Sequence, residues 1–340
     1  MRGGDETLRR PDSMSPPDGS KAIGEQAPAE ARPAPEEYSG PLKVSLDQNF
    51  LWNFHTRENA GACRLHAALG EKVARGQVIC PLHFQETIFE SAMLREELRN
   101  GIFAIGNALS GGWAFRFFGE RIARETLGLV RPDQNRPTLV RGPLRIRPGT
   151  DFEAMGRLHR MAKGEYQQRL DQTPYPPASY RPEMSIDDIH RAIRLERAAS
   201  MWRLLKAIRR DQNLETGKPE WECTVGIAQF LLQHDISSEE CETLIGAVRC
   251  HRWEGQPTLL AHSRLCAQLE LGYLKAGRRS RPNDTLDIYR LAVAVNEADI
   301  ICCDHPMAEL IRQTKLRDSR LQTVFSLKTA EDAAALIEAL

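Results

Sequence analysis

The pattern of hydrophobic and polar positions near the start of the chain predicts strands that alternate with helices. Apolar and polar residues alternate over residues 42–46, which is typical of a strand. Apolar residues recur at helical spacing over residues 57–74, and the short apolar run 78–80 predicts a second strand. A helical pattern resumes over residues 84–98. The order strand, helix, strand, helix favours a parallel sheet with helices packed on it.

The same alternation returns near the other end of the chain. A helix with one apolar face is predicted after Arg281, and the apolar run 299–303 that follows is of the buried-strand type. A further helix is predicted from Pro306 to Lys315, then a strand over residues 322–326 and a closing helix over residues 329–340. Both ends of the chain therefore predict parts of one α/β sheet.

The middle of the chain has helical patterns without intervening strands. Its longest helix is predicted to begin with a capping box, because Ser185 is followed three residues later by Asp188. We interpret residues 41–110 and 255–340 as one α/β domain and residues 111–254 as a large, mostly helical, arginine-rich insertion. Residues 1–40 are rich in Pro, Gly, Ser, Glu and Asp and nearly free of large apolar residues, which predicts a disordered tail.

Composition adds a prediction of compartment. Hydrophobic residues make up 41% of the chain, enough for a globular core, and its 8 cysteines are expected to be reduced thiols. No apolar run approaches the roughly 20 residues that span a bilayer, and the first residues lack a secretion signal pattern. We therefore expect a cytoplasmic protein without membrane contact.

Acidic residues stand where the predicted strands end or the next helices begin. Asp47, Glu86, Asp287 and Asp304 occupy such positions, and Asp284 competes with Asp287 for the same role at one helix start. A parallel sheet gathers the carboxyl ends of its strands at one edge, so these side chains are expected to meet. Crowded carboxylates repel one another unless a cation neutralises them, and hard cations such as Mg²⁺ or Mn²⁺ prefer oxygen ligands.

Each of these acids also has a plain structural interpretation. Asp304 is placed to cap the helix that opens near Pro306, and Asp284 or Asp287 to charge a helix start. Glu86 and Glu90, four residues apart, suit a solvated helix face. A single acid is more often structural, but the position of four acids at matching places in the topology favours a metal-binding cluster.

The arrangement resembles the PIN-domain nucleases. Residues 47–49, Asp-Gln-Asn at a strand end, resemble the first motif of that family, and Glu86 lies where the family has its glutamate. Asp287 and Asp304, separated by a helix and an apolar strand, resemble its third and fourth acids. The resemblance implies a parallel-sheet α/β/α sandwich that hydrolyses RNA phosphodiester bonds with Mg²⁺ or Mn²⁺. It covers residues 41–110 and 255–340 only, and Cys302 stands where the family usually has Thr or Ser.

Other chemistries have less support. His262 and Cys266 are four residues apart, but the paired C-x-x-C spacing of a structural zinc site is absent, so buried thiols and ordinary histidines are favoured. A Cys-His nucleophile lacks a supporting motif. A phosphatase with Asp47 as nucleophile lacks the second aspartate expected at position 49, which is Asn49. No phosphate-binding glycine loop is present, so an NTPase is not expected.

Charge is concentrated in the insertion. Between Gly112 and Arg210 there are 20 Lys and Arg against 11 Asp and Glu, in a chain with formal net charge +0. These basic residues suit a phosphate backbone, and nearby aromatic residues suit stacking on bases. The alternative is a solvated helical surface with snorkelling arginines. The candidates are Arg141, Arg145, Arg147, Arg157, Arg160, Lys163, Arg203, Lys206, Arg209 and Arg210, with Trp113, Phe115 and Tyr166.

Two functional hypotheses follow. The first is a metal-dependent endoribonuclease in which Asp47, Glu86, Asp287 and Asp304 hold the ions and RNA is the partner. The second is a non-catalytic nucleic-acid-binding or protein-interaction module on the same fold. A protein partner or inhibitor and the oligomeric state stay open.

Overall fold

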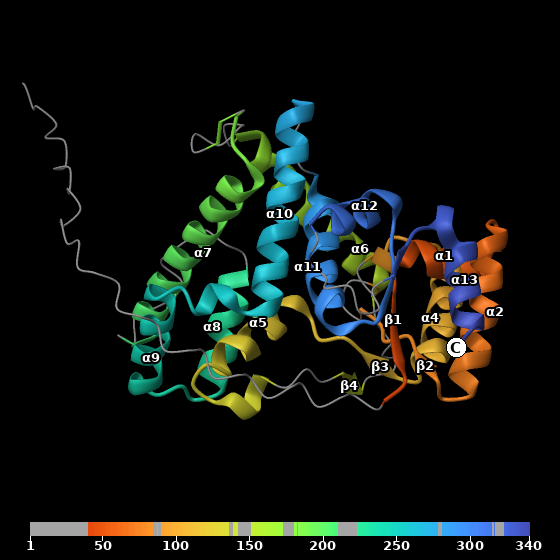
Figure 1. The fold of residues 1–340 in the computed structure, drawn as a ribbon, viewed down its shortest axis with the longest axis horizontal. Coiled ribbons are helices and arrows are strands. Elements are labelled where there is room, and N and C mark those ends of the chain that lie inside the picture. Colours follow the sequence, from red (N-terminus) through yellow and green to blue (C-terminus); the bar gives the residue numbers. More distant parts are fainter. Residues whose placement is uncertain are drawn as a thin grey trace, which may run out of the picture. The chain divides into compact units, whose positions relative to one another are not determined.

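The first strand lies in the middle of a parallel sheet built from both ends of the chain. In the computed structural model, β1 (Leu42–Leu46) pairs in parallel with β2 (Val78–Ile79) on one side and β5 (Ile300–Cys302) on the other. β5 pairs in parallel with β6 (Thr323–Phe325), so the order among the described residues is β2-β1-β5-β6 (Figure 1). The predicted α/β class with a parallel sheet is confirmed.

The structure describes residues 40–83, 87, 90–135, 139–141, 151–172, 180–181, 183–209, 223–277, 281–314, 316 and 323–340. The expected disordered tail, apart from Gly40, lies outside these residues. The division into an α/β domain and an insertion stays a prediction, while residues Gly40–Leu340 form one compact unit.

Helices make up most of the described chain. They are α1 (Gln48–Thr56), α2 (Ala60–Ala74), α4 (Glu96–Ser110), α5 (Phe118–Leu127), α6 (Phe152–Gln172), α7 (Ile186–Arg209), α8 (Cys223–Gln233), α9 (Ser238–Arg249), α10 (Pro257–Ala276), α11 (Pro282–Glu297), α12 (His305–Thr314) and α13 (Ala330–Glu338). None of the helices in the described part is long and apolar enough to cross a membrane.

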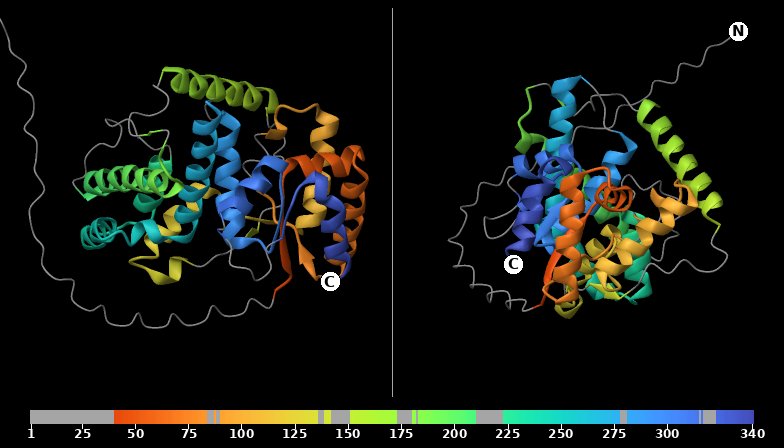
Figure 2. Two further views of the ribbon diagram at one scale, coloured as in Figure 1. Left: turned by 45° about the horizontal axis from the view of Figure 1, so that its top comes forward. Right: turned by 90° about the vertical axis from the view of Figure 1, so that its right-hand side faces the viewer.

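Alternate residues of β5 belong to two different apolar cores. Ile300 and Cys302 pack with α1, α2, α4 and α13, whereas Ile301 and Cys303 pack with α5 and α7–α12. This division follows from the two-residue period of a strand, which sends successive side chains to opposite faces. Both views of Figure 2 place helices on each side of the strands, and α2 packs along α13.

Ser45 is a buried polar residue within the central strand β1. Ser45 is 3% exposed, and its hydroxyl lies 2.9 Å from Nε2 of His83, which is also buried. The imidazole is stacked on Phe115, with ring centroids 4.7 Å apart. A buried hydroxyl is tolerated when it has such a partner, so polar alternation and a central position are compatible here.

Three local features differ from the expectations. α1 follows β1 directly, although helical structure was expected only from residue 57. The helix expected over residues 84–98 is interrupted: residues 87, 90–91 and 96–98 are helical, but the chain turns over residues 92–95 before α4 begins. The middle of the chain contains an antiparallel strand pair, β3 (Trp113–Ala114) with β4 (Val140–Arg141), beside its helices. The expected Ser185–Asp188 capping box is confirmed.

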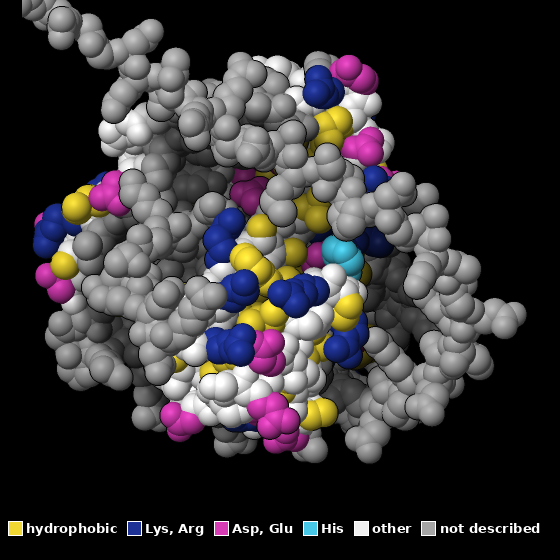
Figure 3. Space-filling model, turned by 90° about the vertical axis from the view of Figure 1, so that its left-hand side faces the viewer, with side chains coloured by type: hydrophobic (Ala, Val, Ile, Leu, Met, Phe, Trp, Pro, Cys, Tyr) yellow, Lys and Arg dark blue, Asp and Glu magenta, His cyan; other side chains and the backbone are white. Residues whose placement is uncertain are grey.

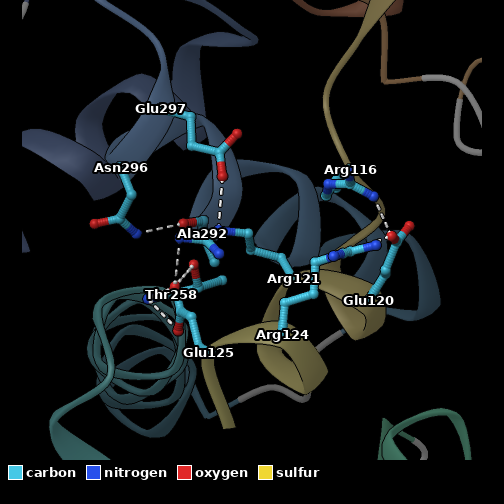
Figure 4. A network of polar contacts seen from close by, with 9 residues as sticks. All are labelled: Arg116, Glu120, Arg121, Arg124, Glu125, Thr258, Ala292, Asn296 and Glu297. Carbon is cyan, nitrogen blue, oxygen red and sulfur yellow. Dashed lines mark hydrogen bonds and ion pairs between the residues drawn. The ribbon is translucent and has the colours of Figure 1, made fainter. Parts of the chain in front are cut away.

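A buried ionic network joins the helices on the α5 side of the sheet. Arg121 on α5 lies with its Nε 2.7 Å from Oε1 of Glu297 on α11 and its Nη2 3.3 Å from Oε1 of Glu125 (Figure 4). Glu125 also accepts bonds from the backbone N–H and hydroxyl of Thr258 on α10. Burial raises the pKa of both glutamates, and the charge of Arg121 opposes that rise.

We predict that Arg121→Met is strongly destabilising. The change leaves two buried carboxylates without their cation, and breaking a buried ion pair from one side costs about 3–5 kcal/mol. Arg124→Met is the matched control, because Arg124 lies on the same helix and pairs with the partly exposed Glu120. Urea unfolding at pH 7.5 measures both free energies. Equal losses in the two variants would contradict the structural role of the network.

Candidate acidic site

Asp47 directs its carboxylate away from the helix that it precedes. It occupies the N-cap position of α1, where an aspartate commonly accepts a bond from the helix backbone, but its side chain makes no such bond. Instead, Oδ1 of Asp47 lies 2.8 Å from Nη1 of Arg290 on α11. Asp47 is only 6% exposed, so this carboxylate is buried at the carboxyl end of β1.

Arg290 is the centre of the candidate acidic site. Its Nη2 donates to Oδ1 of Asp287 at 2.7 Å, and its Nη1 also lies 3.9 Å from Oε2 of Glu90. Arg290 is 5% exposed, so the guanidinium neutralises Asp47 and Asp287 within the protein interior. The expected counter-ion was a divalent metal, which stays a prediction, and here a side chain of the protein supplies positive charge.

Asp287 lies in the first turns of α11 and has a strongly shifted acidity. Burial raises the pKa of Asp287 to about 6, Arg290 lowers it, and the charges of Asp47, Asp304 and Asp284 raise it further. The carboxylates of Asp47, Asp287 and Asp304 are therefore near enough to influence one another. This is the convergence expected at the carboxyl edge of a parallel sheet.

Asp304 has the capping role that was considered as its structural alternative. Its Oδ1 accepts the backbone N–H of Met307 at 3.0 Å in the first turn of α12. The residue is partly exposed, and burial raises its pKa while the Met307 bond lowers it. One oxygen of Asp304 is thus used by the helix, and a carboxylate has a second oxygen for another partner.

Asp284 lies in the first turn of α11 and forms a hydrogen bond to the backbone at the start of that helix. Its Oδ2 accepts the backbone N–H of Arg281 at 2.6 Å and also the hydroxyl of Tyr273 on α10. It lines a cleft of about 210 Å³ between α10 and α12. These contacts support the structural alternative for Asp284, and its expected role as a metal ligand stays a prediction.

Glu86 lies outside the described residues, so its expected role is a prediction only. The segment that follows it does approach the site, because Glu90 lies near Arg290 and Ser91 accepts a bond from the Gln48 amide at 3.2 Å. Gln48 is the residue directly after Asp47. The loop after β2 is thereby joined to the end of β1.

Two site residues were not identified from the sequence. Arg290 follows Asp287 by three residues, and this i,i+3 spacing of opposite charges on a helix that is otherwise apolar was the available signal. His83 comes directly after the short strand and Pro81–Leu82, and nothing local marks it. Burial, followed by the charge of Arg290, holds the pKa of His83 well below its usual value, so it is a neutral imidazole beneath the site.

The described acidic side chains of the site offer the right type of ligand atom for a hard cation, but they are not arranged closely around one point. The printed sequence offers carboxylate oxygens, the ligands that Mg²⁺ and Mn²⁺ take. Within the described ranges, however, no three His, Cys, Asp or Glu side chains stand close enough to hold one ion. Asp47 and Asp287 both use Oδ1 for Arg290, and their second oxygens remain for a cation if the guanidinium shifts.

The alternative thiol and zinc chemistries gain no support. Nε2 of His262 lies 3.7 Å from Sγ of Cys266, so this pair does meet. Burial raises the pKa of Cys266 and lowers that of His262, which leaves a thiol beside a neutral imidazole. A nucleophilic pair needs shifts in the opposite directions. Burial likewise raises the pKa of Cys302.

Several basic residues expected to face phosphates have partners of their own. Arg209 pairs with Glu242, and the Lys206 ammonium lies 3.9 Å from the ring centroid of Trp202. On the face drawn in Figure 3, which carries α7 and α9, Lys and Arg side chains gather around hydrophobic ones. The described part of the structure does not include Arg145, Arg147 and Arg210, nor the side chains of Arg141 and Tyr166.

Phe115 is not available for stacking on a base. It is 3% exposed and packed on His83. Trp113 is half-buried in the β3–β4 pair and remains accessible in part. The aromatic contribution expected from this segment is therefore smaller than its composition indicated.

The chain was compared with models of known protein families, with curated proteins and with solved structures, and none matches.

We predict that Asp287→Asn stabilises the metal-free protein at neutral pH. With a pKa of about 6 when folded and 3.8 when unfolded, the native carboxyl binds its proton more tightly. The contribution of Asp287 to stability therefore falls as pH rises from about 4 to about 6. At about 1.36 kcal/mol per pKa unit, removing it raises stability at pH 7.5 by up to about 3 kcal/mol.

Urea unfolding in chelator from pH 4 to pH 7.5 tests this expectation. The advantage of Asp287→Asn over wild type should be near zero at pH 4 and largest above pH 6. If the difference in free energy of unfolding between the variant and wild type does not vary with pH, the Asp287 carboxyl does not have a raised pKa in the folded protein.

Proposed function

We propose that this chain is a metal-dependent nuclease, an endoribonuclease on a PIN-like α/β/α sandwich. The observation that carries the proposal is the position of Asp47, Asp287 and Asp304 around the carboxyl ends of β1 and β5, where Asp47 and Asp287 share Arg290 and the charges of Asp47 and Asp304 raise the pKa of Asp287. A buried aspartate at an N-cap position that makes no cap bond is directed toward another role. Such carboxylates are the ligands of hard cations in phosphodiester hydrolysis.

The protein side chains would share the work as follows. Asp47, Asp287 and Asp304 would hold Mg²⁺ or Mn²⁺, which supplies a Lewis acid and an activated water when bound. Arg290 keeps Asp47 and Asp287 directed at a common point. The pKa of about 6 for Asp287 applies to the metal-free protein, where a proton competes with the cation for this carboxylate, so metal binding and cleavage are expected to strengthen between pH 5 and pH 7.

A second candidate function rests on Arg290 itself. A guanidinium already bound to Asp47 and Asp287 satisfies these carboxylates without a metal, which favours a non-catalytic module that binds nucleic acid or protein. The face that carries α7 and α9, where Lys and Arg side chains lie around hydrophobic ones, would then be its functional surface. The two candidates differ in one property, namely metal-dependent strand cleavage.

We expect purified protein to cut a labelled single-stranded RNA only with Mg²⁺ or Mn²⁺. Asp47→Asn, Asp287→Asn and Asp304→Asn should each reduce the cleavage rate at least a hundredfold, since an amide keeps the shape of the carboxylate but loses the charge that holds the cation. RNA binding in chelator should be kept or improved, because repulsion of the phosphate is reduced. A time course on denaturing gels measures cleavage.

Glu239→Gln is the control for this experiment, because Glu239 is exposed on α9 and its loss removes one charge elsewhere. It should cut like wild type. Cutting by wild type in chelator, or full activity in all three Asn variants, would refute the carboxylate site and favour the binding module.

A second test asks whether Arg290 stands in for a divalent cation. Arg290→Met leaves Asp47 and Asp287 buried without a counter-ion, so stability in chelator should fall by about 3–5 kcal/mol. Mn²⁺ should then raise the melting temperature of the variant more than that of wild type, because a ligand that binds only the folded state stabilises it. Arg75→Met, which removes an exposed ion pair with Glu71, is the control. If Mn²⁺ changes the melting temperature of neither wild type nor Arg290→Met, that result would contradict a metal site.

A further inference from the structure

α6 lies directly on the segment that leads into the acidic site. Gly156 on α6 is buried, and a Cβ atom at this position would lie 3.2 Å from the carbonyl oxygen of Ala92 and 3.4 Å from Sδ of Met93. A larger residue here would push the carbonyl of Ala92 away by a few tenths of an ångström, so glycine suits this close approach. Glu90 and Ser91, which contact Arg290 and Gln48, directly precede this contact.

Other contacts hold the same end of α6. Phe152 packs near Phe103 with ring centroids 6.3 Å apart, and the Arg99 guanidinium lies 3.9 Å from the Phe152 centroid. α6 also contacts α11, the helix that carries Asp287 and Arg290. The first half of α6 is therefore placed by packing on both sides of the acidic site.

Two cations follow the buried glycine on one face of α6. Arg160 and Lys163 come four and seven residues after Gly156, which is the spacing of one helix face. Arg160 is exposed, and its Nη1 donates to Sδ of Met93 at 3.4 Å, a weak acceptor. Among the described residues, neither Arg160 nor Lys163 forms an ion pair.

Arg157 provides the contrast on the same helix. Its Nη1 lies 2.8 Å from Oε1 of Glu153, and its Nη2 lies 4.0 Å from Oδ2 of Asp151. The positive charge of Arg157 is therefore balanced within α6 and the residue before it. Arg160 and Lys163 have no such ion pair among the described residues, and their helix lies beside a site whose carboxylates repel phosphate.

We propose that Arg160 and Lys163 on α6 bind backbone phosphates of a single-stranded RNA and hold it beside the acidic site. The inference rests on the proposed nuclease function for its choice of ligand, and charge complementarity with phosphate supports it. The guanidinium of Arg160 is exposed and donates to a thioether, a weak acceptor, so it can reorient toward a phosphate at little cost. The carboxylates set where cleavage occurs, and α6 supplies the attraction that brings the strand to them.

Fluorescence anisotropy with a labelled single-stranded RNA of mixed sequence tests the proposal. The full chain is used in chelator, so that no cleavage is needed, across 50–300 mM KCl. Arg160→Gln with Lys163→Gln should weaken binding at least tenfold at 50 mM. The slope of log affinity against log salt should become less steep by about 1.4, because each phosphate contact on a single strand contributes roughly 0.7 and the variant loses two contacts.

Three comparisons decide the outcome. Arg157→Gln, the matched control, should lose less than twofold, and the charge-preserving pair Arg160→Lys with Lys163→Arg should bind nearly as wild type. Unchanged binding in the Gln pair, an equal loss in Arg157→Gln, or no RNA binding by wild type overturns the proposal. Equal binding of a polyglutamate peptide, lost in the same Gln pair, would assign the surface to an acidic protein instead.

The result is separable from the test of the nuclease. Loss of binding in the Gln pair with no cleavage by wild type would leave α6 as an RNA-binding surface on a non-catalytic module. Cleavage by wild type with unchanged binding in the Gln pair would keep the nuclease and reject the role of α6.

Discussion

The contact of Arg290 with Asp47 and Asp287 is the interaction on which the candidate site depends. The carboxylates of buried Asp47 and partly buried Asp287 repel each other, and each loses hydration that a nearby cation replaces. Arg290 supplies that cation from the same helix as Asp287, and in doing so it ties α11 to the end of β1. The carboxylates that could bind a divalent ion therefore have a positively charged partner even when no ion is bound. The balance between guanidinium and metal is the central chemical question of this protein.

The sheet and the positions of the acids could be predicted from the sequence because both depend on local pattern. Apolar runs give the strands, and in a parallel sheet the residue after each run lies at one edge, so Asp47 and Asp304 were placed correctly. Arg290 could not be assigned in the same way. An arginine on a helix has the same local pattern whether it faces solvent or a buried acid, and only the tertiary position of α11 makes the difference.

α1 shows a second limit of local reasoning. Its nine residues include Asn, Phe, Trp, His and Thr, which have modest helix propensity, and helices this short are marginal in isolation. Phe50, Leu51 and Phe54 are almost fully buried, so packing against the sheet stabilises the helix. The same reasoning applies to Ser45, whose polar character in a central strand is explained only by His83.

The pairing of β1 with β5 also has a consequence for biosynthesis. Lys43 donates its backbone N–H to a carboxylate oxygen of Asp299, a residue 256 positions later. At roughly 5–20 residues per second, a ribosome reaches that residue tens of seconds after β1 emerges. During this interval β1 has β2 beside it but lacks its second neighbour, and an unpaired strand edge is prone to association with other chains. The helices between them thus have time to fold first, and chaperone binding to the nascent chain is expected to concentrate on its first sheet segments.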